Sequence, residues 1–143
     1  MNEALVARWN ETVAPQDEVW HLGDFAWRMS AENAAALLAR LNGRKHLITG
    51  NNDDAVVTGL SGWASVQAYK ELELEGVWLI LGHYPFRTWN RMYKGAYNLH
   101  GHSHGALSGM TRQVDVGVDV WDFRPVSLAA LRVRRRFTKR VSR

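Results

Sequence analysis

Four short apolar runs in this chain each end at a glycine that is followed directly by a polar residue. They are VWHLGD (residues 19–24), HLITGNND (46–53), VWLILGH (77–83) and YNLHGHSH (97–104). Short runs rich in β-branched and aromatic residues are typical of buried strands, and glycine permits a sharp turn at the strand end. This pattern favours an open α/β sheet, in which ligands bind outside the carboxyl ends of the strands.

The segments around these runs carry helix signals. A first helix, capped by Asn2 and ended by Pro15, is predicted from an apolar stripe at residues 5, 6, 9 and 13. Ser30 is the expected cap of a second helix over residues 31–41, closed by Gly43. The predicted strands cover residues 19–22, 46–49, 66–74, 77–81, 96–100 and 114–118, with a short helical turn after GNNDD. The sequence therefore predicts a layered α/β domain with a mixed sheet.

The polar residues after the apolar runs are candidate metal ligands. The chain contains no cysteine, so a metal site would rest on histidine, carboxylate, amide and water ligands. The candidates are Asp24, Asn51, His83, His102 and His104. These nitrogen and oxygen donors suit Mn, Fe, Zn or Ni. A lone histidine at a strand end is more often a hydrogen-bonded loop residue, but the repeated context favours one shared site. His21 and His100 lie within strand sequence and either orient ligands or fill the core.

Charge is distributed unevenly along the chain, whose formal net charge is +4. Residues 132–143 carry seven Lys and Arg and no acid, which leaves 11 basic and 14 acidic side chains, a net −3, in residues 1–131. We therefore predict one domain over residues 1–131 and a basic tail over residues 132–143, which either binds nucleic acid or is a solvated terminus. Because the sequence shows no signal-peptide core and no apolar run of membrane length, we predict a cytoplasmic protein without membrane contact.

The order GD, GNND, GH, GHSH resembles the calcineurin-like metallophosphoesterases, whose signature runs DxH, GD, GNH(D/E), GH, GHxH. The resemblance covers residues 20 to about 122, and WHLGDF, GHYPFRTWN and DVGVDVWDFRPVS are similar to a small prokaryotic and phage branch of that superfamily. It implies a layered α/β fold with mixed β-sheets flanked by helices. It also implies a hydrolase that cleaves a phosphate monoester or diester with a metal-activated water.

The resemblance further implies a division of the ligands between two metal ions. Asp24 would bridge the two ions, and His104 would belong to one of them. Asn51, His83 and His102 would complete the ligand set of the other ion.

Two motifs depart from the family pattern. No Asp-x-His precedes Asp24, so the resemblance implies that the chain begins one strand late and holds one ion rather than two. It then also implies a sheet edge beside the strands that end at Asp24 and at HGHSHG. In GNND, Asn52 stands where the family has a histidine thought to protonate the leaving group. An amide can hold a phosphoryl oxygen but does not titrate near neutrality, so substrates with good leaving groups should be least affected.

Three interpretations of function remain open. The first is a metal-dependent phosphoesterase with Asn52 as a catalytic residue and with Arg87, after the GH turn, as either a phosphate contact or a solvated surface residue. The second is a metal-binding module without turnover. The third is a nucleic-acid-binding protein that uses the basic tail. The sequence identifies neither the physiological substrate nor the oligomeric state.

Overall fold

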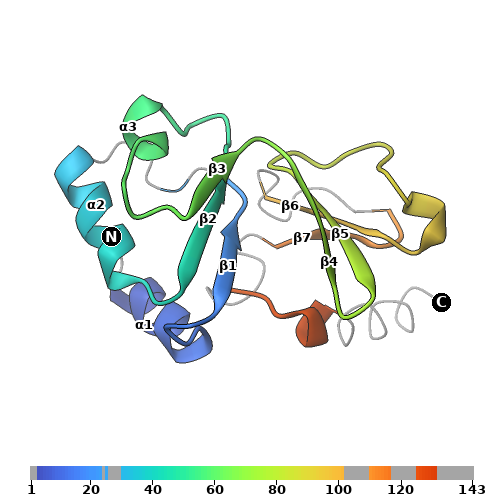
Figure 1. Cartoon of the computed structure of the whole chain (residues 1–143), viewed down its shortest axis with the longest axis horizontal. Coiled ribbons are helices and arrows are strands. Elements are labelled where there is room, and N and C mark those ends of the chain that lie inside the picture. Colours follow the sequence, from blue (N-terminus) through green and yellow to red (C-terminus); the bar gives the residue numbers. More distant parts are fainter. Residues whose placement is uncertain (1–2, 24, 26–29, 102–109, 117–124, 132–143) are drawn as a thin grey trace.

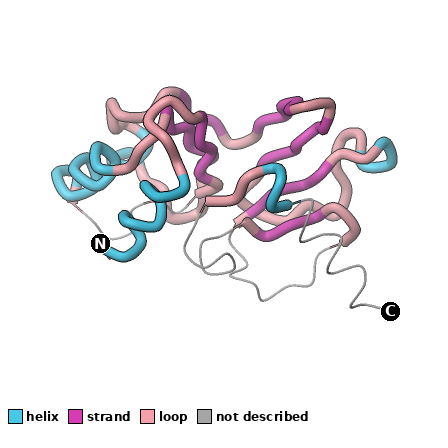
Figure 2. Tube along the Cα trace, turned by 90° about the horizontal axis from the view of Figure 1, so that it is seen from below, coloured by secondary structure: helices cyan, strands magenta, loops and turns pink. Residues whose placement is uncertain are grey.

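The computed structural model describes most of the chain, and a thin grey trace marks the remainder (Figure 1). The described residues are 3–23, 25, 30–101, 110–116 and 125–131. Within them, two β-sheets lie next to each other and three α-helices gather beyond the first sheet (Figure 1, Figure 2). The helices, the first sheet and the second sheet form successive layers.

The first sheet contains three parallel strands in the order β1-β2-β3. Their bounds are β1 Glu18–His21, β2 Arg44–Ile48 and β3 Ser65–Gln67. Parallel neighbours cannot be joined by a tight turn, so helices connect them. The helices of this half are α1 Glu3–Thr12, α2 Ala31–Arg40 and α3 Ala55–Thr58.

The second sheet has four strands in the order β4-β5-β6-β7. Their bounds are β4 Lys70–Leu74, β5 Val77–Leu81, β6 Tyr97–His100 and β7 Gln113–Asp115. β4 and β5 form an antiparallel hairpin through Glu75 and Gly76, at φ 51° and 80°, whereas β5, β6 and β7 run parallel. The connection from β5 to β6 contains a short 3-10 helix, η1 (Met92–Lys94).

Side-chain alternation along β2 places the first sheet between two apolar layers. Leu47 and Ile48 are both 0% exposed. Leu47 packs with Trp9 of α1 and Leu38 of α2, whereas Ile48 packs with Leu79 and other residues of the second sheet. Successive residues of a strand point to opposite faces, so neighbouring positions belong to different clusters. Fully burying a side chain of this size contributes roughly 1.5–3 kcal/mol to folding.

Most of the predicted elements are confirmed. The second helix begins where the sequence predicts, because the Ser30 side chain accepts a hydrogen bond from the backbone N–H of Asn33 at 3.1 Å. The prediction of a single strand over residues 66–74 is wrong, since β3 ends at Gln67 and β4 begins at Lys70 in the other sheet. The predicted final strand is found at Gln113–Asp115, and its residues 117–118 lie outside the described residues.

The sheet edges agree with only part of the expectation. Among the described residues β1 pairs with β2 alone, so the strand that leads to Gly23 is an edge strand as expected. β6, which leads to HGHSHG, lies between β5 and β7. The prediction of an exposed sheet edge beside this strand is therefore wrong. Within the described residues no helix combines the length and the apolar character needed to cross a bilayer.

Candidate metal centre

The carboxyl ends of β1, β2, β5 and β6 meet, and each is followed by a glycine-containing turn. The backbone N–H of Gly82 donates to the carbonyl of Leu99 at 3.2 Å, and the N–H of Gly101 donates to the carbonyl of His83 at 3.0 Å. These bonds continue the pairing of β5 with β6 past the ends of both strands. The turn after β5 is therefore fixed against the turn after β6.

His83 is buried at this junction, with 3% of its surface exposed. Its Nδ1 lies 2.6 Å from the carbonyl oxygen of Leu22, and its Nε2 lies 2.8 Å from Oδ1 of Asn51. A carbonyl oxygen can only accept, so Nδ1 carries a proton, and Nε2 of the neutral ring then presents a lone pair to Oδ1. This contact is satisfied either by the Asn51 amide turned so that its N–H donates to Nε2, or by a cation bound between Nε2 and Oδ1.

Gly23, the glycine of the GD pair, allows His83 and the turn that carries Asn51 to lie close to the turn after β1. Gly23 has φ +103°, and a Cβ there would lie 2.3 Å from Nδ1 of His83 and 2.8 Å from Cα of Gly50. Real Cβ atoms do not approach other atoms so closely. Any side chain at Gly23 would therefore displace His83 or the loop that carries Asn51, besides straining its own backbone.

Asp53 joins two of the turns and was not identified as a site residue from the sequence. Its Oδ1 accepts the backbone N–H of Phe25 at 2.8 Å, and its Oδ2 accepts the N–H of Gly50 at 2.8 Å. The carboxylate thus holds the GD turn after β1 against the GNND turn after β2. The only sequence signal for this role is the aspartate at the end of a glycine-initiated turn, where such residues commonly accept local backbone hydrogen bonds.

The structure brings together two of the five predicted metal ligands, Asn51 and His83. The other three, Asp24, His102 and His104, lie outside the described residues. Among the residues that the structure describes, no group of three or more His, Asp or Glu side chains is arranged to hold a metal ion.

The predicted catalytic residue and the predicted substrate contact lie on different loops. Asn52 is half-buried in the turn beside Asn51, and Arg87 is exposed on the loop that follows His83.

The two histidines within strands differ in their surroundings. His100 is 2% exposed, and its Nδ1 lies 2.9 Å from the carbonyl oxygen of Gly101. The ring of His21 packs edge-on against Phe25 at 5.3 Å and tilted against Trp63 at 6.5 Å. His21 is therefore part of an aromatic cluster that supports the residue following Asp24.

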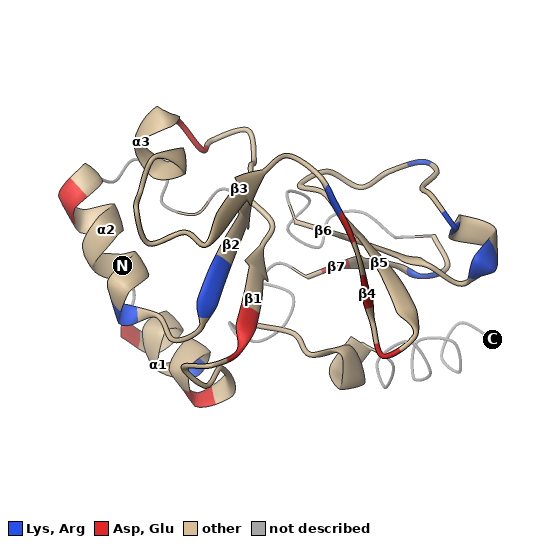
Figure 3. Cartoon of the chain, in the orientation of Figure 1, with Lys and Arg blue, Asp and Glu red and all other residues tan. Residues whose placement is uncertain are grey.

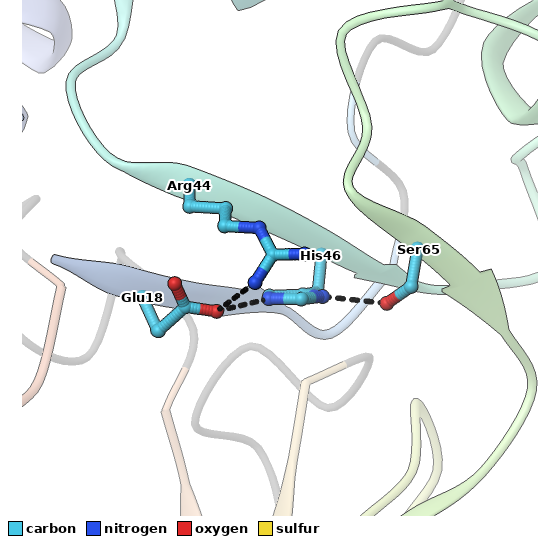
Figure 4. A network of polar contacts seen from close by, with 4 residues as sticks. All are labelled: Glu18, Arg44, His46 and Ser65. Carbon is cyan, nitrogen blue, oxygen red and sulfur yellow. Dashed lines mark hydrogen bonds and ion pairs between the residues drawn. The ribbon is translucent and has the colours of Figure 1, made fainter. Parts of the chain in front are cut away.

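A second polar cluster lies nearer the amino ends of the strands (Figure 4). His46 of β2 contacts Oε1 of Glu18 at 2.6 Å through Nε2 and Oγ of Ser65 at 2.5 Å through Nδ1. The ring also stacks on Trp20, with centroids 4.2 Å apart. The hydrogen bond from His46 lowers the pKa of Glu18, and the nearby charge of Arg44 acts in the same direction. Because these contacts join β1, β2 and β3, we interpret the cluster as a clamp across the first sheet.

Known proteins are similar to this chain in sequence and in fold. A family model described as the calcineurin-like phosphoesterase superfamily domain matches residues 1–137. An uncharacterised protein of Methanocaldococcus jannaschii is 29% identical over 136 residues, which cover 90% of this chain and 71% of the relative. The gene 66 protein of Mycobacterium phage D29 is 33% identical over 148 residues, covering 82% of this chain and 74% of the relative. A solved protein of unknown function from Aquifex aeolicus has a similar fold, with a TM-score of 0.73, 23% identity and coverage of 90% and 82% of the two chains.

Proposed function

Because the chain belongs to the calcineurin-like phosphoesterase superfamily, we propose that it hydrolyses a phosphate monoester or diester with the help of a bound divalent metal ion. The proposed metal ligands are Asp24, Asn51, His83, His102 and His104. Asn52 and Arg87 are the proposed substrate contacts. Manganese, iron, zinc and nickel all accept this mixture of imidazole, amide and carboxylate donors.

The observation that carries the proposal is the pair formed by His83 and Asn51. Their Nε2 and Oδ1 atoms are 2.8 Å apart, and both present lone pairs when the other ring nitrogen donates to Leu22. Two ligands at about 2.1 Å on one octahedral ion lie about 3 Å apart, so the observed spacing fits neighbouring positions in a coordination shell. A divalent ion bound there would lower the pKa of a bound water and offset negative charge on phosphate oxygens.

The chain's own residues prepare the site before any ligand binds. The Leu22 carbonyl selects the His83 tautomer whose Nε2 carries a lone pair and faces Asn51, as outer hydrogen bonds commonly do in metal sites. Asp53 fixes the turn that presents Asn51, and the burial of His83 keeps bulk water away from its ring. These contacts reduce the rearrangement needed when a metal or a phosphate arrives.

Asn52 sets the expected substrate range. Its amide can donate a hydrogen bond to a phosphoryl oxygen but cannot protonate a departing alkoxide. Loss of a general acid commonly costs about 10²- to 10⁴-fold in rate. Aryl esters, whose leaving groups need little protonation, should therefore be cleaved faster than alkyl esters.

The proposal is tested with the full chain, first stripped of metal and then given Mn²⁺ and bis(p-nitrophenyl) phosphate. We expect metal-dependent release of nitrophenolate. His83→Ala and Asn51→Ala should each lower the rate by more than the ~10–100-fold typical of a residue that only orients a ligand. Asn33→Ala, an exposed change on α2, is the matched control and should keep full activity. Equal, metal-independent rates for wild type and His83→Ala would overturn the proposal.

A metal-binding module without turnover is the second candidate, and the residue Asn52 favours it. Titration calorimetry with Mn²⁺ separates the two candidates, because such a module would bind the ion but release no nitrophenolate. The substitution Asn52→His restores a titratable group at this position. An increase in rate would show that proton transfer to the leaving group limits hydrolysis.

A further inference from the structure

The loop and η1 between β5 and β6 form an exposed surface that is both basic and aromatic. Residues 84–95 contain no acid. Their cations are Arg87, Arg91 and Lys94, all exposed. Of the tyrosines, Tyr93 is 90% exposed and Tyr84 is 47% exposed. Figure 3 shows blue segments along this connection and around η1, whereas the red segments of the second sheet lie on β4 and β7. We call residues 84–95 the basic loop.

The beginning of the basic loop is held by polar side chains of β6 and β7. The backbone N–H of Phe86 donates to Oδ1 of Asn98 at 3.0 Å, and the carbonyl of Phe86 accepts from Nε2 of Gln113 at 2.5 Å. Asn98 is 0% exposed and donates to the carbonyl of Ile80 at 3.1 Å. Arg87, the next residue, is therefore presented by a backbone fixed to β5, β6 and β7.

The end of the basic loop is held as firmly. The indole of Trp89, which is 8% exposed, donates to the carbonyl of Ala96 at 2.9 Å. The Asn90 amide donates to Oε1 of Glu71 on β4 at 2.9 Å. The Arg91 guanidinium lies 4.2 Å from the ring centroid of Trp78. The backbone of this loop and the Arg91 side chain thus have little freedom to lose when the loop binds a partner.

Glu71 on β4 places one negative charge beside this surface. Both oxygens of Glu71 are occupied, since Tyr69 donates to Oε2 at 2.5 Å and Asn90 donates to Oε1. These hydrogen bonds lower the pKa of Glu71, and Arg91 lowers it further. Arg112, beside Gln113, has a buried Nε that finds no hydrogen-bond acceptor among the described residues.

We propose that the basic loop binds single-stranded nucleic acid and presents its phosphodiester backbone to the candidate metal centre. Cations track such a backbone, and exposed aromatic rings stack on unpaired bases, which a duplex keeps stacked inside. An acidic peptide would match the positive charge of the loop but would offer no bases for its aromatic rings to stack on. The loop also begins directly after His83, whose ring meets the Tyr84 ring edge-on at 4.9 Å, so the surface is continuous with the site. Binding follows from the loop itself, whereas cleavage of the bound strand rests on the proposed function.

Binding is measured by the fluorescence anisotropy of a labelled 15-nucleotide oligo(dT), with the full chain in EDTA so that no hydrolysis occurs. Tyr93→Ala should weaken binding roughly 5- to 150-fold, as loss of one base–aromatic stack does, whereas Tyr93→Phe should bind like wild type. Arg87→Gln with Lys94→Gln should reduce the slope of log K against log salt by about 1.4, at about 0.7 per lost phosphate contact.

Matched controls separate the basic loop from other cations. Arg40→Gln removes one charge on α2, where Arg40 pairs with Glu3 at 2.6 Å, and should leave oligo(dT) binding unchanged. Substituting Arg134, Arg135 and Arg136 by serine tests the basic tail. If only the tail substitutions weaken binding, or if polyglutamate or a 15-base-pair duplex competes as well as oligo(dT), the proposal is overturned.

Cleavage assays with Mn²⁺ distinguish this proposal from the proposed function. Hydrolysis of bis(p-nitrophenyl) phosphate without oligo(dT) binding would overturn the basic-loop proposal and leave the phosphoesterase intact. Oligo(dT) binding that depends on Tyr93, without hydrolysis of either compound, would support the surface and overturn the phosphoesterase. Cleavage of oligo(dT) that is lost in His83→Ala, while binding in EDTA is kept, would support both.

Discussion

Replacing Gly23 by alanine tests whether the candidate metal centre depends on close approach of three turns. Gly23 lies in the GD turn after β1, with φ +103°. The added methyl group would meet Nδ1 of His83 at 2.3 Å, the Cα of Gly50 at 2.8 Å and the N of Gly50 at 2.9 Å. The first contact blocks the hydrogen bond from His83 to Leu22, and the other two press on the turn that carries Asn51.

The expected loss in the free energy of unfolding has two parts. Ordinary contacts between such atoms begin at about 3.5 Å, so His83 must move by about 1 Å to relieve the first clash. Crowding of this kind typically destabilises a protein by about 1–3 kcal/mol. The left-handed backbone adds about 1–2 kcal/mol for a residue with a Cβ. We therefore expect Gly23→Ala to lower the free energy of unfolding by about 2–5 kcal/mol.

Gly76→Ala is the matched control, because Gly76 has φ +80° but an added Cβ would meet nothing within 4 Å. It should lose only the backbone part, about 1–2 kcal/mol. Urea unfolding gives both free energies, and titration calorimetry with Mn²⁺ gives the affinity of the site. Gly76→Ala should keep wild-type affinity and activity, whereas a displacement of about 1 Å in Gly23→Ala should cost about 10²-fold in rate. Equal stability and equal Mn²⁺ affinity for the two variants would refute the steric argument.

Two further predictions concern carboxylates. The pKa of Glu18 is lowered by its hydrogen bond with His46, so this carboxylate stabilises the fold above its ordinary pKa of 4.5 and the contribution is lost as the pH falls through its lower folded value. Glu18→Gln should therefore unfold at lower urea than wild type at pH 7, with the difference shrinking below pH 4.5, and a constant difference would contradict the linkage. Asp53→Asn should destabilise the chain by about 1–3 kcal/mol, because an amide N–H would face the backbone donor of Gly50 or Phe25. Asp54→Asn is its control, since Oδ1 alone caps α3 and Asn caps equally well.

The sequence predicts those parts of the fold that local chemistry determines. Ser30 marks the start of α2, and the apolar runs locate β1, β2, β5 and β6. The break between β3 and β4 could not be foreseen, because residues 66–74 keep a strand-like composition while the chain passes from one sheet to the other. That passage depends on which strand each half pairs with, and pairing is a property of the whole fold.

The same distinction applies to the site. The position of polar residues after strand ends predicts the meeting of Asn51 with His83, because the carboxyl ends of parallel strands converge. The role of Asp53 requires knowing that the turn after β1 lies against the turn after β2. The clamp formed by Glu18, His46 and Ser65 requires the register of three strands, which no local pattern specifies.

The position of His83 explains how a site of this kind can be ready before its ligand binds. Its ring is hydrogen-bonded to Leu22 after β1, its backbone carbonyl to Gly101 after β6, and its own chain continues β5. Contacts from three strands thus determine where Nε2 lies, and none of them uses the atom that would bind a metal. A metal would therefore find Nε2 and the Asn51 oxygen already adjacent, and little binding energy would be needed to order them. Arg87, the proposed substrate contact, is less constrained than His83. Its side chain is exposed, and only its backbone is fixed through Phe86. We infer that the fold makes the proposed metal-binding residues rigid and leaves side-chain adjustment to Arg87, the proposed substrate contact.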